Sequence, residues 1–228
     1  MTPYLNGSGS GWMKDEQLLA SMVTSLRRAH KWLGEKPEVY TDTLTAECLR
    51  DLTDDAIINE KLEGLYENDR IPHTLWSYSK LKTLSYQTEP YIHFDLDLFF
   101  RKNLDPKFLE CDLLIQCYDD MNLMKRDIPE HLKVIYNYET IRDLYEWDGF
   151  WDRDWYEWHG ANLGILGMNN MDLHNRYIEL IFGWIEKNRD AMNYHPAYVP
   201  NPTFFEQQPM VVLADEMGMK TNYMFPNS

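Results

Sequence analysis

The chain has 228 residues, of which 44% are hydrophobic and 14% aromatic. This content is enough to build one sizeable core, which argues against a disordered chain and for one domain over residues 1–228. The formal net charge of −15 repels phosphate backbones and anionic lipid, and this makes nucleic acid a poor partner.

The chain has no stretch near the roughly 20 apolar residues needed to span a bilayer. Its Gly/Ser/Asn-rich start also lacks the apolar core of a signal peptide. The three cysteines, Cys48, Cys111 and Cys117, are odd in number, and none has a CxxC partner or a His at metal-ligand spacing. Buried, reduced thiols suit this pattern better than disulfides or a zinc site. These features predict a cytoplasmic protein without a transmembrane segment.

The first sixty residues predict helices that alternate with strands. Apolar residues recur at helical spacing over residues 14–33, with acidic residues in the first turn and Gly34 as the stop. Residues 37–42 then have the pattern of a short strand, residues 45–52 that of a helix, and residues 56–58 that of another brief strand.

The remaining elements continue this alternation, and two uninterrupted apolar strands, 112–118 and 161–168, are predicted to be central in a sheet. Strands that alternate with helices argue for an α/β fold, with an open, mostly parallel sheet flanked by helices. In chain order we expect a helix over about 72–87, strands over 91–94, 112–118 and 161–168, a helix after Asn170 and another near 205–218.

Two carboxylates, Asp95 and Asp97, directly follow the predicted strand over 91–94. In open α/β sheets ligands collect at the carboxyl ends of strands, where the loops are free to vary. Two Asp residues one position apart can offer hard oxygen ligands to Mg²⁺ or Mn²⁺, which keep other positions for water and diphosphate oxygens. Turn formation after the strand is the competing interpretation of the same two residues.

Two segments resemble the GT-A glycosyltransferases. In the first, a helix with a basic residue (76–84) precedes an apolar strand, the Asp-x-Asp motif and a hydrophobic, basic, Asn-Leu continuation (90–104). The second, over 160–169, resembles the Asn-x-Gly strand that lines the sugar pocket of those enzymes. The opening, with Gly11-Trp12, a long helix and Tyr40-Thr41-Asp42 in this order, also resembles a poorly characterised glycosyltransferase-like family. This resemblance implies a GT-A-like (Rossmann-like) open, mixed and mostly parallel sheet.

The resemblance implies donor-site roles for Lys80, Asn162, Gly164 and Asp42 and makes Glu206 the catalytic candidate, and each role has a structural alternative. Lys80 would contact donor phosphates, or would lie solvated on its helix. Asn162 and Gly164 would contact the donor sugar, or would form a bulge in a central strand. Asp42 would touch the nucleoside, or would cap the following helix. Glu206 would act as a base or sugar contact, or would begin an exposed helix.

The same resemblance makes Asp97 the main metal ligand, with Asp95 assisting through water or the ribose. His93 is predicted to be an interior histidine rather than a ligand, because a strand points it away from the face of its neighbours. The aromatic and acidic run over residues 145–158 is either an acceptor-binding rim, since Trp and Tyr stack on sugars, or a loop packed over the sheet.

These implications predict transfer of a sugar from a nucleotide-diphosphate-sugar donor to a glycan or other hydroxyl acceptor, with Mn²⁺ or Mg²⁺ as cofactor. A non-catalytic GT-A-like domain that binds a nucleotide or glycan is the alternative. A nucleotidyltransferase ranks behind both, since the glycines of residues 7–11 lack the strand before and the basic residue after a phosphate loop. The family's usual first strand and its late His ligand have no counterpart here, since no His follows His195. We therefore expect a single domain that lacks these two elements.

Overall fold

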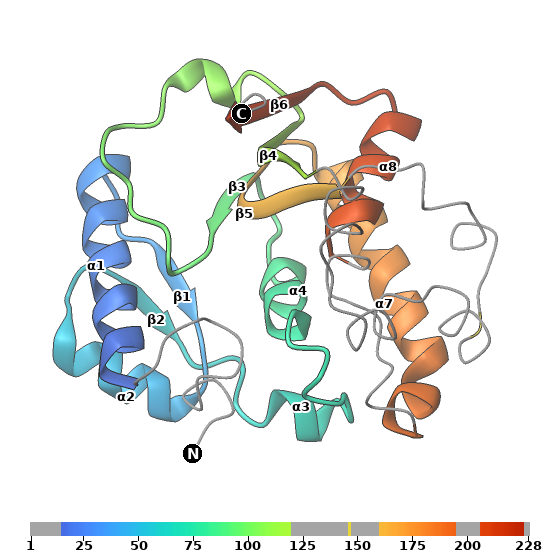
Figure 1. Cartoon of the computed structure of the whole chain (residues 1–228), viewed down its shortest axis with the longest axis horizontal. Helices are drawn as coiled ribbons and strands as arrows, with labels where there is room; N and C mark the ends of the chain where they lie inside the picture. Colours follow the sequence, from blue (N-terminus) through green and yellow to red (C-terminus); the bar gives the residue numbers. More distant parts are fainter. Residues whose placement is uncertain (1–14, 120–145, 147–159, 195–205, 226–228) are drawn as a thin grey trace, which may run out of the picture. The chain divides into compact units, whose positions relative to one another are not determined.

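The structure, a computed structural model, describes residues 15–119, 146, 160–194 and 206–225. Helices and strands occur in both halves of the chain, so the protein has an α/β fold (Figure 1). The chain divides into two compact units: unit 1 comprises residues 1–65 and 94–106, and unit 2 comprises residues 66–93 and 107–228. A sheet lies in each unit, with β1 and β2 in unit 1 and the other strands centred on unit 2.

Unit 1 is built from two helix-strand pairs. Helix α1 (Asp15–Leu33) ends before Gly34, whose φ of +88° suits a residue without a Cβ. Strand β1 (Glu38–Tyr40), helix α2 (Thr43–Leu52) and strand β2 (Ile57–Asn59) follow, and the two strands pair in parallel. All four elements lie where the sequence pattern predicts them.

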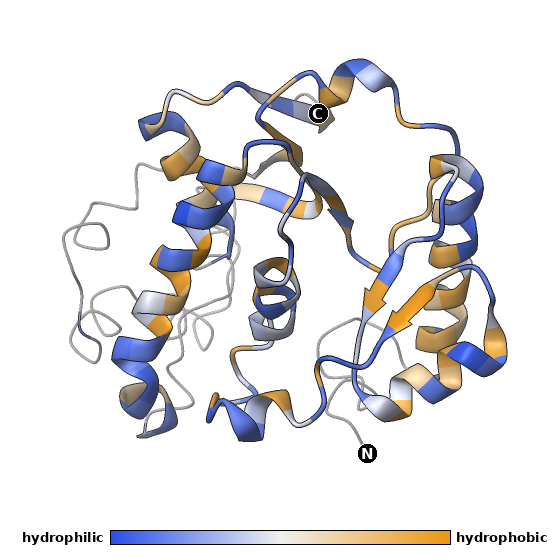
Figure 2. Ribbon diagram, turned by 180° about the vertical axis from the view of Figure 1, so that it is seen from behind, coloured by the Kyte–Doolittle hydropathy of each residue, from blue (hydrophilic) through white to orange (hydrophobic). Residues whose placement is uncertain are grey.

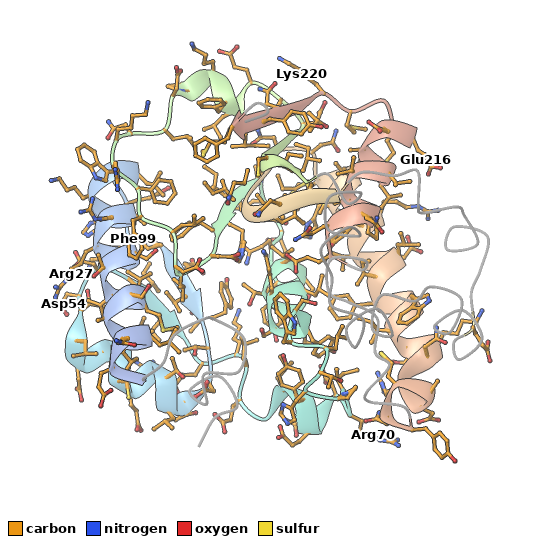
Figure 3. The ribbon with its side chains drawn as sticks, viewed as in Figure 1. Arg27, Asp54, Arg70, Phe99, Glu216 and Lys220 are labelled. Carbon is orange, nitrogen blue, oxygen red and sulfur yellow. The ribbon has the colours of Figure 1, made fainter. Side chains whose placement is uncertain are left out.

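The apolar faces of these elements form the core of unit 1. Figure 2 shows hydrophobic residues along β1 and β2 and on α1. The opposite side of α1 is polar, and the exposed side chains of Arg27 and Asp54 point outward from unit 1 (Figure 3). The buried core residues are Val23, Leu26, Val39 and Leu49, with Met22, Ala56, Ile58 and Leu96 packed against them.

Unit 2 contains a four-stranded sheet in the order β3-β5-β4-β6. Strand β4 (Leu113–Asp119) pairs antiparallel with β5 (Gly160–Met168) and parallel with β6 (Thr221–Phe225), so the sheet is mixed. Strand β3 (Tyr91–Phe94) forms the edge beside β5. The two strands that we expected to be central are indeed the two inner ones.

The helices of unit 2 are α3 (Leu65–Asn68) at the unit boundary, α4 (Tyr78–Ser85), the 3₁₀ helix η1 (Pro106–Leu109), α7 (Met171–Tyr194) and α8 (Gln208–Glu216). Helix α7 begins where Asn170 Oδ1 accepts hydrogen bonds from the backbone N–H groups of Asp172 and Leu173, both at 3.1 Å. Helix α8 packs against β5 and α7, and α4 packs against α7 (Figure 1). The polar end of α8 at Glu216 and the start of β6 after Lys220 are labelled in Figure 3.

Four local predictions need correction. Helix α4 begins at Tyr78 instead of near residue 72, because the preceding residues form turns closed by hydrogen bonds from Leu75 N to Pro72 O and from Tyr78 N to Leu75 O. The short helix α3 lies in a stretch expected to be irregular, and the partly buried β6 was not predicted. The sheet of unit 2 is mixed, as expected, but its inner strand pair is antiparallel, whereas we expected mostly parallel pairing. A buried apolar strand has the same sequence pattern in either direction, because burial on both faces sets that pattern.

Candidate functional site

Strand β5 of unit 2 bulges at the polar residues predicted to contact the donor sugar. Ile115 of β4 pairs with Leu166 of β5, whereas Cys117 pairs with Asn162. Between these two pairs, the three residues 163–165 of β5 lie opposite a single residue of β4, Gln116. A bulge of this kind leaves backbone groups without their ladder partners and changes the direction of side chains, and it is common beside functional sites.

Two predicted site residues satisfy the backbone groups at this bulge. Asn162 Oδ1 accepts a hydrogen bond from the Gly164 N–H at 3.0 Å. Lys80 Nζ donates to the Leu163 carbonyl oxygen at 2.8 Å, across a sequence separation of 83 residues. The bulge that we gave as the alternative interpretation of Asn162 and Gly164 is therefore present, and contact with a sugar stays a prediction.

Lys80 also forms a buried ion pair with Glu206. Lys80 Nζ lies 2.6 Å from Glu206 Oε1, and the two side chains are 13% and 3% exposed. The solvated lysine and the exposed helix start, which were the structural alternatives for these residues, are both wrong. The pair places one positive and one negative charge at the bulge, and each depends on the other because an unpaired buried charge is strongly unfavourable.

A tyrosine that the sequence assigns only to the apolar face of α7 supports Glu206. Tyr177 is fully buried, and its hydroxyl donates to the backbone carbonyl of Glu206 at 2.9 Å. Burial, and then the nearby Glu206 carboxylate, raise the pKa of Tyr177 far above its usual range, so the hydroxyl stays protonated. The hydroxyl of a buried Tyr usually has a hydrogen-bond partner, so a Tyr on the apolar face of a predicted helix could have indicated a polar contact there.

A second buried polar pair lies at the start of α7. His174 is 2% exposed, and its Nδ1 lies 3.2 Å from the hydroxyl oxygen of Tyr91 in β3. Burial lowers the pKa of His174, although a hydrogen bond to the Gln87 backbone opposes this shift. The neutral imidazole is therefore favoured. The sequence gives little signal for this pair, because its members are 83 residues apart.

Gln116 was not predicted as a site residue. Its Oε1 atom is buried and has no hydrogen-bond partner among the described residues, and the same holds for Oε1 of Gln207, which follows Glu206. Buried polar atoms are normally bonded, so an orphaned one calls for an explanation. A glutamine inside the apolar run of β4 was the signal that could have identified it.

The Asp-x-Asp motif forms a turn in unit 1. Strand β3 ends at Phe94, and a hydrogen bond of 3.1 Å from Leu98 N to Asp95 O closes the turn that follows. Leu96 packs against the apolar core of unit 1, whereas Asp97 is exposed. Ser25 of α1 donates to the Leu98 carbonyl at 2.6 Å and fixes the end of the turn. The predicted strand and turn are therefore both present.

The ligand chemistry of this turn suits Mg²⁺ or Mn²⁺. Asp95 and Asp97 offer hard carboxylate oxygens on both sides of a side chain that is anchored in the core. Within the described ranges, no group of three or more His, Cys, Asp or Glu side chains comes together. A cation held by this pair would take its further ligands from water or phosphate, which is the usual arrangement for Mg²⁺ in nucleotide sites.

Asp42 caps helix α2 in unit 1. Its Oδ1 accepts from the Thr45 N–H at 2.9 Å, and its Oδ2 accepts from the Thr45 hydroxyl at 3.0 Å. Both carboxylate oxygens thus have partners at the helix N-terminus, as in the capping alternative, and contact with a nucleoside stays a prediction. His93 is half-buried in β3. The run over 145–158 lies outside the described residues, except for Glu146.

Together, a mixed sheet with helices packed against it and a bulge lined by polar side chains define an α/β protein with a candidate ligand site in unit 2. Residues 4–228 match a family of unknown function, DUF6734, and the chain belongs to this family. No curated protein and no solved structure matches the chain. In the part of the chain that the structure describes, no helix is long and apolar enough to cross a membrane.

Proposed function

We propose that this protein is a GT-A-like glycosyltransferase that moves a sugar from a nucleotide-diphosphate-sugar donor to a hydroxyl of a glycan or other acceptor. The observation that carries the proposal is the convergence of Lys80, Asn162, Gly164 and Glu206 at the β5 bulge. These residues come from three separate segments, and the resemblance to GT-A enzymes assigned Lys80, Asn162 and Gly164 to the donor site and Glu206 to a base or sugar contact. Their meeting in one buried polar cluster supports that assignment.

In this proposal the cluster binds and orients the transferred sugar. Lys80 fixes the carboxylate of Glu206 through their ion pair, and Tyr177 fixes the Glu206 backbone. A carboxylate held in this way can accept a hydrogen bond from a sugar hydroxyl or take up its proton. Asn162 holds the Gly164 N–H through Oδ1, and its amide nitrogen can donate to another sugar oxygen.

The Asp-x-Asp turn of unit 1 supplies the carboxylates for the cation in the proposal. Asp97 is the main ligand, and Asp95 assists through water or the ribose. A bound Mn²⁺ or Mg²⁺ supplies Lewis acidity that offsets the charge on a departing nucleoside diphosphate. The contribution of this chain is to hold the two carboxylates in a turn whose Leu96 is anchored in the core.

A non-catalytic domain that binds a nucleotide or glycan is the second candidate. The internal pairing of Lys80 with Glu206, and of Asn162 with the Gly164 N–H, favours it because these groups already satisfy one another. Such a domain would bind a sugar nucleotide without hydrolysing or transferring it.

Calorimetric titration with UDP-glucose, UDP-galactose and GDP-mannose, each with and without Mn²⁺, tests the proposal. We expect Mn²⁺-dependent binding of at least one donor to the wild-type protein, and its loss in Asp97→Ala. Asp54→Ala is the matched control, because Asp54 is an exposed Asp of unit 1 outside the turn, and this variant should bind like the wild type.

Slow Mn²⁺-dependent hydrolysis of the bound donor would separate the two candidates, since a non-catalytic domain binds without turnover. Glu206→Gln should reduce this hydrolysis more than it reduces donor binding. A folded wild-type protein that binds none of these sugar nucleotides, with or without Mn²⁺, would refute the proposed function.

A further inference from the structure

The side-chain amide of Gln116, in β4, fills the space beside Gly164 of the β5 bulge in which a side chain at position 164 would begin. A Cβ atom placed on Gly164 would collide with Oε1 of Gln116 and would lie 3.1 Å from Oδ1 of Asn162. Gly164 is not among the glycines with positive φ. Space, and not backbone conformation, therefore requires a glycine here, and the amide group of Gln116 fills that space.

The Gln116 oxygen lies among groups that cannot bond to it. Oδ1 of Asn162 also lies beside the position of a Gly164 Cβ, but it is an acceptor too and already holds the Gly164 N–H. The Leu163 carbonyl is another acceptor, and Lys80 is already bonded to it. Gln116 Oε1 is therefore a buried acceptor whose partner must bring an O–H or N–H group.

The charges at the bulge indicate a neutral partner. Lys80 and Glu206 form a buried ion pair here, and a further buried charge without a counterion of its own would be strongly unfavourable. A hydroxyl fits these conditions, because it can donate to Gln116 Oε1 and at the same time accept from the Asn162 amide nitrogen.

We propose that Gln116 is a specificity-determining residue, whose Oε1 accepts a hydrogen bond from a hydroxyl of a neutral sugar. The inference rests on the proposed function and narrows it: the transferred group is a neutral sugar with a free hydroxyl at the contacted position. Gly164 acts through Gln116 by leaving room for its amide.

Donor binding to Gln116→Met tests this inference, because Met keeps the length of the side chain and removes the acceptor. UDP-glucose, UDP-galactose and GDP-mannose are titrated with Mn²⁺, together with UDP and GDP, which lack the sugar. We expect a loss of roughly three- to tenfold in affinity for the sugar nucleotide that binds the wild type, and unchanged affinity for UDP and GDP. Gln17→Met, at an exposed position of α1, is the control.

Deoxy analogues of the bound donor identify the hydroxyl. The analogue that lacks it should bind the wild type as weakly as the full donor binds Gln116→Met, and should bind Gln116→Met with no further loss. Gly164→Ala should reproduce the selective loss, because the added methyl group displaces the Gln116 amide. Gly183→Ala is the control glycine substitution, since nothing lies within 4 Å of its added Cβ.

Thermal unfolding without ligand supplies the second readout. Gln116 Oε1 is buried without a hydrogen-bond partner among the described residues, so its removal in Gln116→Met breaks no hydrogen bond of that oxygen. We therefore expect the unfolding midpoint of Gln116→Met to equal or exceed that of the wild type. If the amide nitrogen instead bonds Asn162, the midpoint falls and all nucleotides bind equally less well, which overturns the inference. Equal binding of a donor to wild type and Gln116→Met overturns it while the proposed function stands. Absence of donor binding to the wild type overturns both.

Discussion

Removal of the Lys80 ammonium should strongly destabilise unit 2. In Lys80→Met the carboxylate of Glu206, only 3% exposed, loses its counterion, and the Leu163 carbonyl loses its donor. Breaking one side of a buried ion pair costs about 3–5 kcal/mol of unfolding free energy. For a chain of this size, each kcal/mol lowers the melting temperature by roughly 2–4 °C, which gives a total shift of roughly 6–20 °C.

Two further variants separate the loss of the charge pair from a general effect of the substitution. Lys80→Met with Glu206→Gln removes both charges and should recover most of the lost stability, because no unpaired charge is then buried. Lys82→Met is the matched control on the same helix. Lys82 Nζ lies 3.0 Å from Asp69 Oδ2, but these side chains are 27% and 29% exposed, so the loss should be only about 0–1 kcal/mol.

Urea denaturation followed by tryptophan fluorescence measures these differences, since the chain has eight Trp residues. The burial of the Lys80–Glu206 pair leads us to expect a large loss in Lys80→Met, a small loss in Lys82→Met and recovery in the double variant. Equal, small losses in both single variants would refute this expectation, because they would show that the Lys80–Glu206 pair is no more buried in solution than a surface pair.

Three other predictions concern the fold of each unit. Asp42→Ala should cost about 0.5–2 kcal/mol in urea denaturation, since it removes the cap of α2, and Asp42→Asn should cost less; equal losses would contradict the capping role. Gly183→Ala should raise stability by about 0.5–1 kcal/mol, because Gly183 is exposed within α7 and its Cβ would meet nothing; a loss would be inconsistent with that open position. Burial lowers the pKa of His174 below its ordinary value of 6.5, so the unfolded chain binds this proton more readily, and stability should fall as pH drops below that value. This decrease of stability below pH 6.5 should be smaller in His174→Gln; an identical pH dependence of the two proteins would argue against a role for the His174 proton.

The sequence singled out several polar residues that the structure brings together, but not their contacts with one another. Lys80, Asn162, Gly164 and Glu206 could be selected from local motifs, because each stands at a recognisable place beside a strand or helix. The Lys80–Glu206 pair spans separate segments, and no local pattern encodes it. Gln116 was missed for the same reason: its meaning depends on the residues opposite it, in another strand.

The sequence by itself determined the order and type of most described elements, with α3, η1 and β6 as the exceptions, because helical and strand periodicities are local and record which side of an element is buried. It also determined that the Asp-x-Asp motif follows a strand. Only the tertiary structure decided the antiparallel pairing of β4 with β5, the bulge at residues 163–165 and the burial of Lys80 against Glu206. These features depend on strand register and long-range packing, in which residues far apart in the chain compete for the same partners.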